Sequence, residues 1–304
     1  MKKTLSTILL SILTLAWAGS ACAEKAQFKF NSWDGPEIRV FVTHPDGLAP
    51  DRPVVFVMHG VQRNADEYRD QWHELAIKHQ FLLVVPEFSN AAFKGSRGYN
   101  LGDVFDADGK EVAEANWSYS AIEPIFDEVR QRFSVTSERY ALYGHSAGSQ
   151  FVHRFIFHLP NARVSQVVSA NAGWYMMPDY GQDFPYGLKG SVITPEKLKL
   201  ALQLPVTILL GDKDTDPNHK SLRRKPEAMA QGEHRFARGH SFFDAAEAAA
   251  KQLDVPFNWQ LISVDGADHD NRLMAPAAIP YLLGAGGSSK PSASALGRLG
   301  SAAP

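Results

Sequence analysis

Cysteine is nearly absent from this sequence. Cys22 is the only cysteine among 304 residues, which excludes an intramolecular disulfide and any metal site built from several cysteines. If residues 1–23 are removed, as argued below, no cysteine remains that could act as a nucleophile. The folded chain must then be held together by core packing alone.

An excess of charge of one sign is also missing. The chain has 31 Lys and Arg residues against 33 Asp and Glu residues, a formal net charge of −2. Residues 1–23 contain two lysines and no acidic residue, so their removal changes the net charge to −4. This mildly negative charge argues against general binding to nucleic acids.

Sequence signals for bound cofactors or metals are lacking too. No glycine-rich phosphate loop is present, and the segment DADGK (106–110) lacks the later ligands and the closing glutamate of a calcium loop. A turn at Asp108-Gly109 explains that segment better. We therefore expect neither a cofactor nor a metal.

A hydrophobic run long enough to span a bilayer comfortably is not found. The apolar run at 5–17 follows Lys2 and Lys3 and precedes Ala21-Cys22-Ala23, an order typical of a secretory signal peptide cut after Ala23. The alternatives are a membrane anchor, for which the run is short, and lipid modification of Cys22, for which the preceding residues lack the expected leucine. The sequence predicts a secreted or periplasmic protein without membrane contact after cleavage.

The remaining chain has two compositionally different parts. Residues 284–304 are rich in Gly, Ser, Ala and Pro and are predicted to form a flexible tail. Residues 24–283 alternate between short apolar runs and segments with helical spacing, as expected of one α/β domain with a mostly parallel twisted sheet and helices on both faces. The predicted strands are 53–60, 81–88, 139–146, 165–173, 205–214 and 257–269, after an extended region at 28–45; the predicted helices are 65–80, 118–133, 147–159, 241–253 and one from about 270.

Ser146 lies between a predicted strand and a predicted helix, in the sequence Gly144-His145-Ser146-Ala147-Gly148. A G-x-S-x-G motif in this context is typical of a nucleophile elbow, the sharp turn that raises a serine hydroxyl above a sheet. Glycines are needed there because a Cβ atom at either flanking position would clash with the neighbouring backbone.

A serine hydroxyl needs a base and an acid to act as a nucleophile. Downstream strands end in Asp212, Asp214 and Asp216 and then in His269, which gives the chain order serine, acid, histidine. Because the carboxyl ends of parallel strands meet at one edge of the sheet, we expect Ser146 and His269 to meet one of these three carboxylates there.

Taken in order, these motifs resemble those of the α/β-hydrolase superfamily. His59-Gly60 follows an early strand, and G-x-S-x-G, Gly211-Asp212-Lys213-Asp214 and Asp268-His269 follow later ones. The run HGVQRNADEY (59–68) is similar to one in secreted esterases related to polyhydroxybutyrate depolymerases and feruloyl esterases. The chain departs from that branch in lacking the cysteine pairs that many of its members use.

The resemblance implies roles that the residues alone leave open. It favours Asp214 as the catalytic acid beside Ser146 and His269, and it implies that the backbone amides of Val61 and Ala147 form an oxyanion hole. His59 is expected to be structural, and Asp270 is expected to cap the last helix.

Two segments could form the substrate pocket. The aromatic loop at 174–187 follows a strand end, and Trp174 and Tyr175 are its best candidates for a pocket wall; the alternative is that they pack the loop onto the body. The segment 218–240 has six basic and two acidic residues. It is either a solvated face or a basic rim, containing Arg223 and Arg224, that attracts an anionic substrate. His145 could contact substrate or simply fill the elbow.

Three functions are compatible with the sequence. The leading one is an exported serine hydrolase that cleaves carboxylic esters, of a small molecule or a polymer, through an acyl-enzyme. The second is an amidase or peptidase acting with the same triad on an acidic polymer such as poly(aspartic acid). The third is a non-catalytic binding protein on the same fold, which is disfavoured because all three triad residues are present in order.

Overall fold

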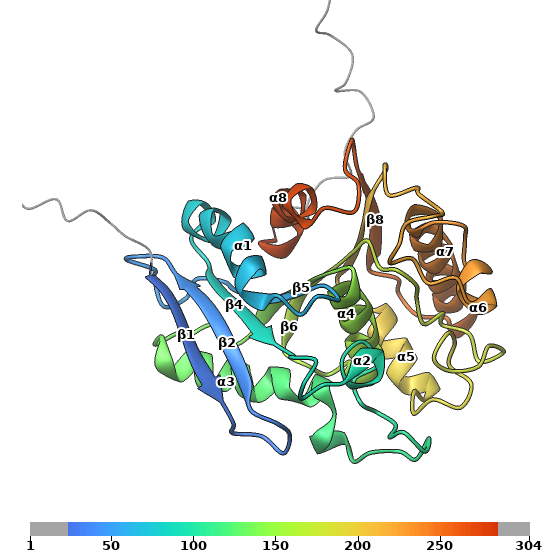
Figure 1. The fold of residues 1–304 in the computed structure, drawn as a ribbon, viewed down its shortest axis with the longest axis horizontal. Helices are drawn as coiled ribbons and strands as arrows, with labels where there is room; N and C mark the ends of the chain where they lie inside the picture. The colour runs from blue at the N-terminus through green and yellow to red at the C-terminus, as the bar shows by residue number, and fades with distance from the viewer. Residues whose placement is uncertain (1–23, 285–304) are drawn as a thin grey trace, which may run out of the picture.

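An eight-stranded sheet forms the centre of the computed structural model, which describes residues 24–284 (Figure 1). The strand order is β1-β2-β4-β3-β5-β6-β7-β8. The proposed signal peptide, and all but the first residue of the proposed tail, lie outside the described residues. The strands are β1 Glu24–Phe30, β2 Ile38–His44, β3 Val54–Met58, β4 Leu82–Glu87, β5 Tyr140–His145, β6 Val164–Ala170, β7 Val206–Gly211 and β8 Trp259–Val264.

Strands β3 to β8 are parallel, whereas β1 pairs with β2 and β2 with β4 in antiparallel fashion. In the register, Met58 lies opposite Gly144 and His145 lies opposite Ala170. The carboxyl ends of β3, β5 and β6 are therefore level with one another. Loops that follow these ends emerge at the same edge of the sheet, the position at which parallel sheets bind ligands.

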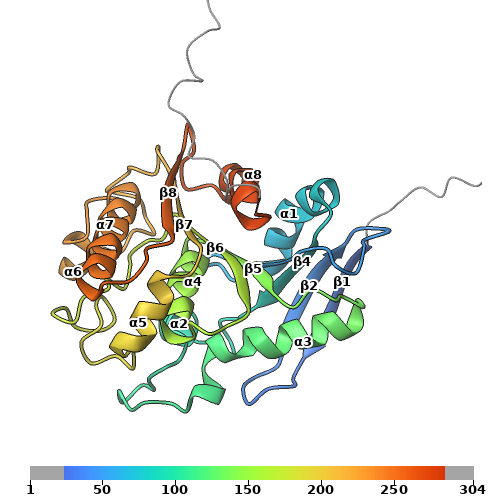
Figure 2. The same ribbon diagram turned by 180° about the vertical axis from the view of Figure 1, so that it is seen from behind.

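Helices cover both faces of the sheet (Figures 1 and 2). One face is covered by α1 (Ala65–His79) and α8 (Asn271–Leu282), and the other by α3 (Ile122–Arg132), α4 (Ala147–His158), α5 (Pro195–Leu202) and α7 (Arg235–Leu253). The central strands have apolar residues on both faces: Val57 packs toward α1 and α8, and Phe56 toward α3. This two-sided burial explains why β3 reads as a continuous apolar run. Two short helices, α2 (Gly95–Gly98) and α6 (Pro226–Met229), lie in connecting loops.

The predicted mostly parallel α/β architecture is confirmed, with several changes at the ends of elements. The helix predicted from 118 is a 3₁₀ turn, Ser118–Ala121, followed by α3, and Pro124 lies in the first turn of α3, where proline is tolerated. Helix α7 begins at Arg235 rather than at 241, because the His234 side chain accepts a hydrogen bond from the Ala237 amide and caps it. Helix α5 had no counterpart among the predicted elements.

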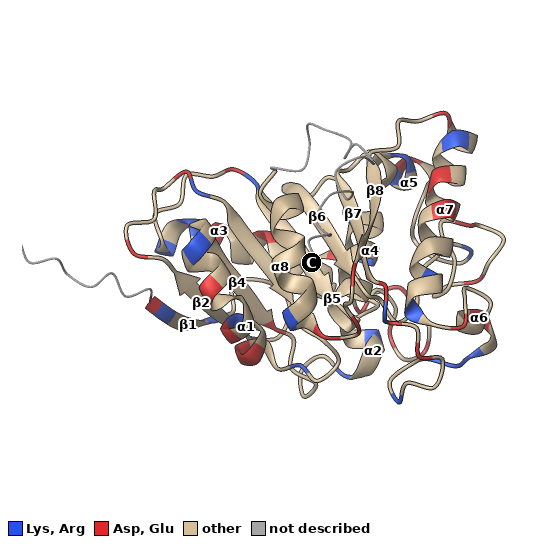
Figure 3. Cartoon of the chain, turned by 90° about the horizontal axis from the view of Figure 1, so that it is seen from above, with Lys and Arg blue, Asp and Glu red and all other residues tan. Residues whose placement is uncertain are grey.

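Charged residues lie mainly on the outer helices and connecting loops, and the central strands are nearly free of them (Figure 3). Among the helices of residues 24–284, none combines the length and the apolarity needed to cross a bilayer.

Candidate active site

Ser146 occupies the sharp turn between β5 and α4, as the sequence predicts. Its backbone has φ 57° and ψ −113°, a strained conformation for a residue with a side chain. The turn is possible because two glycines flank it. A Cβ atom on Gly144 would lie 2.2 Å from the Gly148 carbonyl oxygen, and one on Gly148 would lie 2.0 Å from the Met58 carbonyl oxygen.

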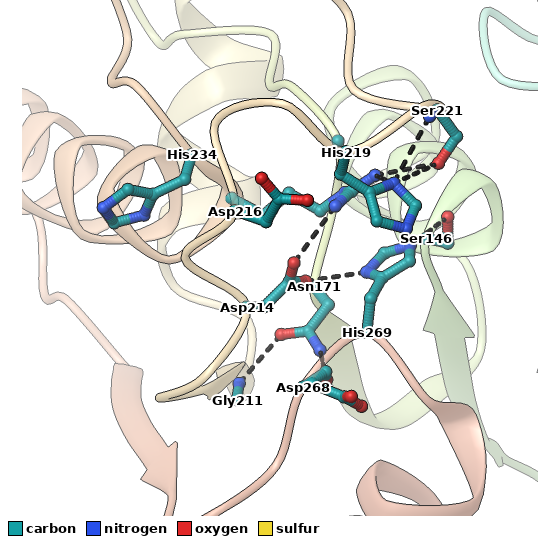
Figure 4. A network of polar contacts seen from close by, with 12 residues as sticks. Ser146, Asn171, Gly211, Asp214, Asp216, His219, Ser221, His234, Asp268 and His269 are labelled. Carbon is teal, nitrogen blue, oxygen red and sulfur yellow. Dashed lines mark hydrogen bonds and ion pairs between the residues drawn. The ribbon is translucent and has the colours of Figure 1, made fainter.

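Ser146, His269 and Asp214 meet at the carboxyl ends of β5, β8 and β7 (Figure 4). The distance from Ser146 Oγ to His269 Nε2 is 3.0 Å, and that from His269 Nδ1 to Asp214 Oδ2 is 2.7 Å. An imidazole that donates from Nδ1 to a carboxylate can accept a proton at Nε2. The arrangement can therefore remove the proton from the serine hydroxyl.

The neighbouring aspartates have other partners. Asp212 accepts a hydrogen bond from the Gly266 amide, and Asp216 accepts one from the Asn218 amide. Asp270 accepts one from the Arg272 amide and caps α8, as expected. Of the three acids that the sequence left open, Asp214 alone reaches His269.

Asp214 is buried and also forms an ion pair with Arg235, whose Nη1 lies 3.0 Å from Asp214 Oδ1. Burial raises the pKa of the Asp214 carboxyl, but the hydrogen bond from His269 and the charges of His269 and Arg235 outweigh burial, and the pKa is lowered. Arg235 also donates to Ser221 Oγ and to His219 Nδ1. In the sequence, Arg235 is marked only as one residue of a basic segment, and this contact could not be predicted from it.

Asn171, which follows β6, joins the loop that carries the acid to the loop that carries the histidine. Its Oδ1 accepts a hydrogen bond of 2.8 Å from the Gly211 amide, and its Nδ2 donates to the Asp268 carbonyl at 3.0 Å (Figure 4). The two loops are in close contact, since a Cβ atom on Gly211 would lie 2.4 Å from the Ala267 carbonyl oxygen. No motif in the sequence marks Asn171 for this role.

The amides proposed for the oxyanion hole lie beside Ser146. Ala147 is the first residue of α4, and Val61 follows the end of β3 with an exposed side chain. Neither amide donates to an acceptor within residues 24–284. His59 has the structural role that was expected: Nδ1 donates to the Gly60 carbonyl and Nε2 accepts from the Phe88 amide. Burial lowers the pKa of His59 to about 3.

A pocket of about 410 Å³ lies in front of Ser146 and His269. His145 also lines it, although its side chain is only 3% exposed. Most of the remaining lining is polar, with four carboxamides and four charged groups: Gln62, Asn64, Gln71, Asn271, Glu67, Lys220, Asp270 and Arg272.

The structure contradicts the prediction that Trp174 and Tyr175 form a wall of this pocket. Tyr175 is fully buried and stacks on Phe242 of α7, with ring centroids 4.4 Å apart. The guanidinium groups of Arg154 and Arg223 both pack against the Trp174 ring, and neither aromatic residue lines the pocket. The loop folds back onto α4 and α7 because burying large aromatic surfaces is favourable.

The prediction for Arg223 and Arg224 is corrected as well, because neither residue lines the pocket. Arg223 is half-buried and donates to the Tyr186 hydroxyl, and Arg224 is exposed to solvent. Arg238, from the same segment, is buried and donates to the carbonyls of Gly173 and Gly232. Of residues 218–240, His219, Lys220 and Ser221 line the pocket.

Residues 24–284 contain no group of three or more His, Cys, Asp or Glu side chains arranged to hold a metal ion.

No protein-family model matches the chain. Comparison with solved structures is more informative. Poly(aspartic acid) hydrolase-1 from Sphingomonas sp. KT-1 is 43% identical, with a TM-score of 0.83, and the match covers 85% of this chain and 98% of that one. The chain belongs to the α/β-hydrolase family.

Other members of this family are also similar. LpqC, the poly(3-hydroxybutyrate) depolymerase from Bordetella parapertussis, is 37% identical with a TM-score of 0.79, over 86% of this chain and 90% of that one. This match confirms the resemblance to the depolymerase branch. A fluorophosphonate-binding serine hydrolase from Staphylococcus aureus, at 15% identity and a TM-score of 0.52, shares the fold.

A curated relative, the bifunctional acetylxylan esterase/xylanase of Neocallimastix patriciarum, is 23% identical over 136 residues. The match covers 44% of this chain and only 18% of that protein. Its relatives are hydrolases and esterases, and the hydrogen bonds that join Ser146, His269 and Asp214 are those of a serine hydrolase.

Proposed function

We propose that this α/β hydrolase cleaves carboxylic esters of a polymeric or bulky substrate through an acyl-enzyme on Ser146. The observation that carries the proposal is the continuous hydrogen-bonded chain from Ser146 Oγ through His269 to Asp214. Two relatives are a hydrolase of poly(aspartic acid) and a depolymerase of poly(3-hydroxybutyrate), and these polymers support a polymeric substrate for this chain.

In the proposed reaction, Ser146 Oγ attacks the acyl carbon while its proton passes to His269 Nε2. The tetrahedral oxyanion accepts hydrogen bonds from the amides of Val61 and Ala147, an interaction that lowers the barrier by about 3 kcal/mol per donor in serine hydrolases. The proton on His269 then goes to the leaving oxygen as the ester bond breaks. Water, activated by the same imidazole, releases the acid and restores the serine.

A second candidate is amide hydrolysis of an acidic polymer such as poly(aspartic acid). It is favoured by Lys220, which is exposed at the pocket, and by the four carboxamide side chains of the lining, whereas Arg272 pairs with Asp270 and Glu67 adds a second carboxylate. Cationic groups attract substrate carboxylates, and carboxamides can hydrogen-bond to the main-chain amides of a polyamide. The same triad serves this reaction, with an amine as the leaving group.

The N-terminal sequence supports export of the enzyme, because two lysines, an apolar run and Ala21-Cys22-Ala23 come in signal-peptide order. Export suits an enzyme whose polymeric substrate does not enter the cell. Mass spectrometry of the mature protein is expected to show Glu24 as the first residue. A mature chain that begins at a diacylglyceryl-modified Cys22 would show lipidation instead.

Substrate assays test the proposed function. Wild-type protein is expected to hydrolyse p-nitrophenyl esters, and polyhydroxybutyrate and poly(aspartic acid) are offered in parallel to separate ester from amide cleavage. Ser146→Ala is expected to lose at least about a thousandfold in kcat on every substrate that wild type cleaves, because the nucleophile is absent. No turnover of any acyl substrate by folded wild-type protein would refute the proposal.

A further inference from the structure

One pair of buried polar side chains beside the triad has no part in the mechanism above. Tyr68 of α1 and His145, the residue before the nucleophile, are joined by a hydrogen bond of 3.0 Å between the tyrosine hydroxyl and His145 Nδ1. Their side chains are 6% and 3% exposed, and both residues line the pocket. The contact joins segments 77 residues apart in the chain.

We assign the tyrosine hydroxyl as the donor of this hydrogen bond. Burial raises the pKa of the Tyr68 hydroxyl and lowers the pKa of His145 well below its usual range. The phenol therefore keeps its proton and the imidazole is neutral. Because the hydroxyl has no other side-chain partner within residues 24–284, its proton is available to His145 Nδ1. His145 is then protonated at Nε2, an atom that is buried without a hydrogen-bond partner.

Both ends of this pair touch the active centre. A Cβ atom on Gly60 would lie 2.9 Å from the Tyr68 hydroxyl oxygen, so the hydroxyl packs directly against the turn that carries the Val61 amide. At the other end, the His145 ring packs against the His269 ring, with centroids 4.8 Å apart. His145 is also covalently linked to Ser146, the residue before the Ala147 amide.

We infer that Tyr68 and His145 are positioning residues whose hydrogen bond fixes the turn carrying the Val61 amide relative to the nucleophile turn carrying the Ala147 amide. The two donors of the proposed oxyanion hole come from different elements, and their separation depends on how α1 and β3 sit against β5. The Tyr68–His145 hydrogen bond crosses that junction. It also holds an uncharged ring against His269, which becomes positively charged during the reaction. The inference rests on the proposed function, because it concerns the geometry of that same site.

Tyr68→Phe removes the hydroxyl and keeps the ring. Because oxyanion donors act in the transition state, the variant is expected to lose about tenfold in kcat on a p-nitrophenyl ester, the loss that one misplaced hydrogen bond causes, with KM changed less than twofold. Tyr140→Phe is the matched control. Tyr140 lies at the opposite end of β5, is equally buried, and donates its hydroxyl to Glu123. It is expected to keep wild-type kcat despite a similar loss in resistance to urea.

A double-mutant cycle with His145→Ala separates positioning from general packing. The tenfold effect of Tyr68→Phe is expected to fall below twofold in the His145→Ala background, because the partner is already gone. Equal kcat for Tyr68→Phe and Tyr140→Phe, or an undiminished effect in the His145→Ala background, would overturn the inference. An inactive wild type would instead indicate that the proposed function has failed.

A measurement on wild-type protein keeps the inference testable if a variant does not fold. Long-range ¹H–¹⁵N correlation of the histidine rings is expected to show His145 as a neutral Nε2–H tautomer. A His145 Nδ1 chemical shift typical of a ring nitrogen without a hydrogen bond would contradict the link between Tyr68 and His145 on which the inference depends.

Discussion

Asp214 is shared between two partners, and this sharing sets the electrostatics of the triad. One oxygen faces His269 and the other faces Arg235, whose side chain is as buried as the carboxylate itself. A buried ion pair costs desolvation, and removal of one partner leaves an uncompensated charge in the interior. Arg235 therefore keeps Asp214 ionised, and it also fixes the His219–Ser221 stretch at the rim of the pocket.

Replacing Arg235 tests whether this ion pair keeps Asp214 ionised. The pKa of Asp214 is lowered in the folded protein, so its ionised form stabilises the fold at neutral pH, and that contribution is lost as the pH falls below its ordinary value of 3.8. Arg235→Met is expected to raise the Asp214 pKa and to lower the free energy of unfolding at pH 7 by about 3–5 kcal/mol. The acid limb of the kcat/KM profile is expected to move to higher pH.

Urea unfolding and pH–rate profiles measure both effects. Arg224→Met is the control, because Arg224 is exposed and makes no hydrogen bond or ion pair within residues 24–284. It is expected to leave both profiles unchanged. If Arg235→Met kept wild-type stability and an unshifted acid limb, the assigned role of the ion pair would be wrong.

At this scale the sequence predicts Ser146 and His269, and the family resemblance favours Asp214, but the residues that support the triad are not predicted. Ser146 and His269 lie in motifs that can be read locally, whereas Arg235 and Asn171 act through contacts with residues 21 and 40 positions away. Nothing in the adjacent sequence marks either residue. Trp174 and Tyr175 are the opposite case, because the sequence predicted a functional role that the structure does not support. Their position after a strand end suggested a pocket wall, but both side chains are buried against the body of the protein.

At the scale of elements, the site depends on how closely α4 approaches β3. Gly148 lies in the first turn of α4 and packs against the Met58 carbonyl at the end of β3. This close approach brings the Ala147 amide toward the loop that holds Val61. The elbow is thus a packing contact between two elements as well as a sharp turn.

Gly148→Ala is expected to force α4 away from β3, because the new Cβ atom would lie 2.0 Å from the Met58 carbonyl oxygen. A loss of at least about 4 kcal/mol in the free energy of unfolding is expected, as for other severe overpacking in a core. Gly47→Ala is the control. Gly47 has a φ of 66° but open space around its Cβ position, so only backbone strain of about 1–2 kcal/mol is expected.

Chemical denaturation measures the free energy of unfolding of both variants. Similar losses for Gly148→Ala and Gly47→Ala would mean that the α4–β3 contact is looser than the structure indicates.

Most elements could be predicted because the central strands are buried on both faces and their apolar runs end in turns. The parallel β3, β5 and β7 lie within one or a few residues of the ranges expected. The pairing of β1 with β2, and of β2 with β4, could not be deduced, because an extended segment does not by itself specify its partner. Helix α7 was predicted to begin too late because its first residues include Arg235, Arg238 and Gly239, and because its start depends on the cap by His234.

For the whole molecule, charge is close to balanced, and the local surplus of basic residues is the feature that bears on substrate. Part of the basic segment 218–240 is internal: Arg235 pairs with Asp214, and Arg238 donates to backbone carbonyls. Lys220 remains exposed at the pocket. Within this segment, the proposed attraction of an anionic substrate therefore depends on Lys220 rather than on Arg223 and Arg224.

Lys220→Glu is expected to raise KM for an anionic ester or for poly(aspartic acid) about threefold to tenfold, because a surface charge pair contributes about 1 kcal/mol and reversal replaces attraction with repulsion. KM for a neutral p-nitrophenyl ester is expected to change less than twofold. The effect is expected to shrink at high salt, which screens exposed charges. Arg224→Glu, away from the pocket, is the control, and an equal effect of both reversals would remove Lys220 from the substrate site.

The account as a whole depends on one claim, that Ser146 is the nucleophile activated by His269. The most direct measurement treats the protein with a fluorophosphonate and locates the adduct by peptide mass spectrometry, because such probes phosphonylate an activated serine. We predict one adduct, on Ser146, with no labelling of folded Ser146→Ala and labelling of His269→Ala slowed at least about a thousandfold. An adduct on another residue, or labelling of Ser146 that is unaffected by the loss of His269, would contradict the account.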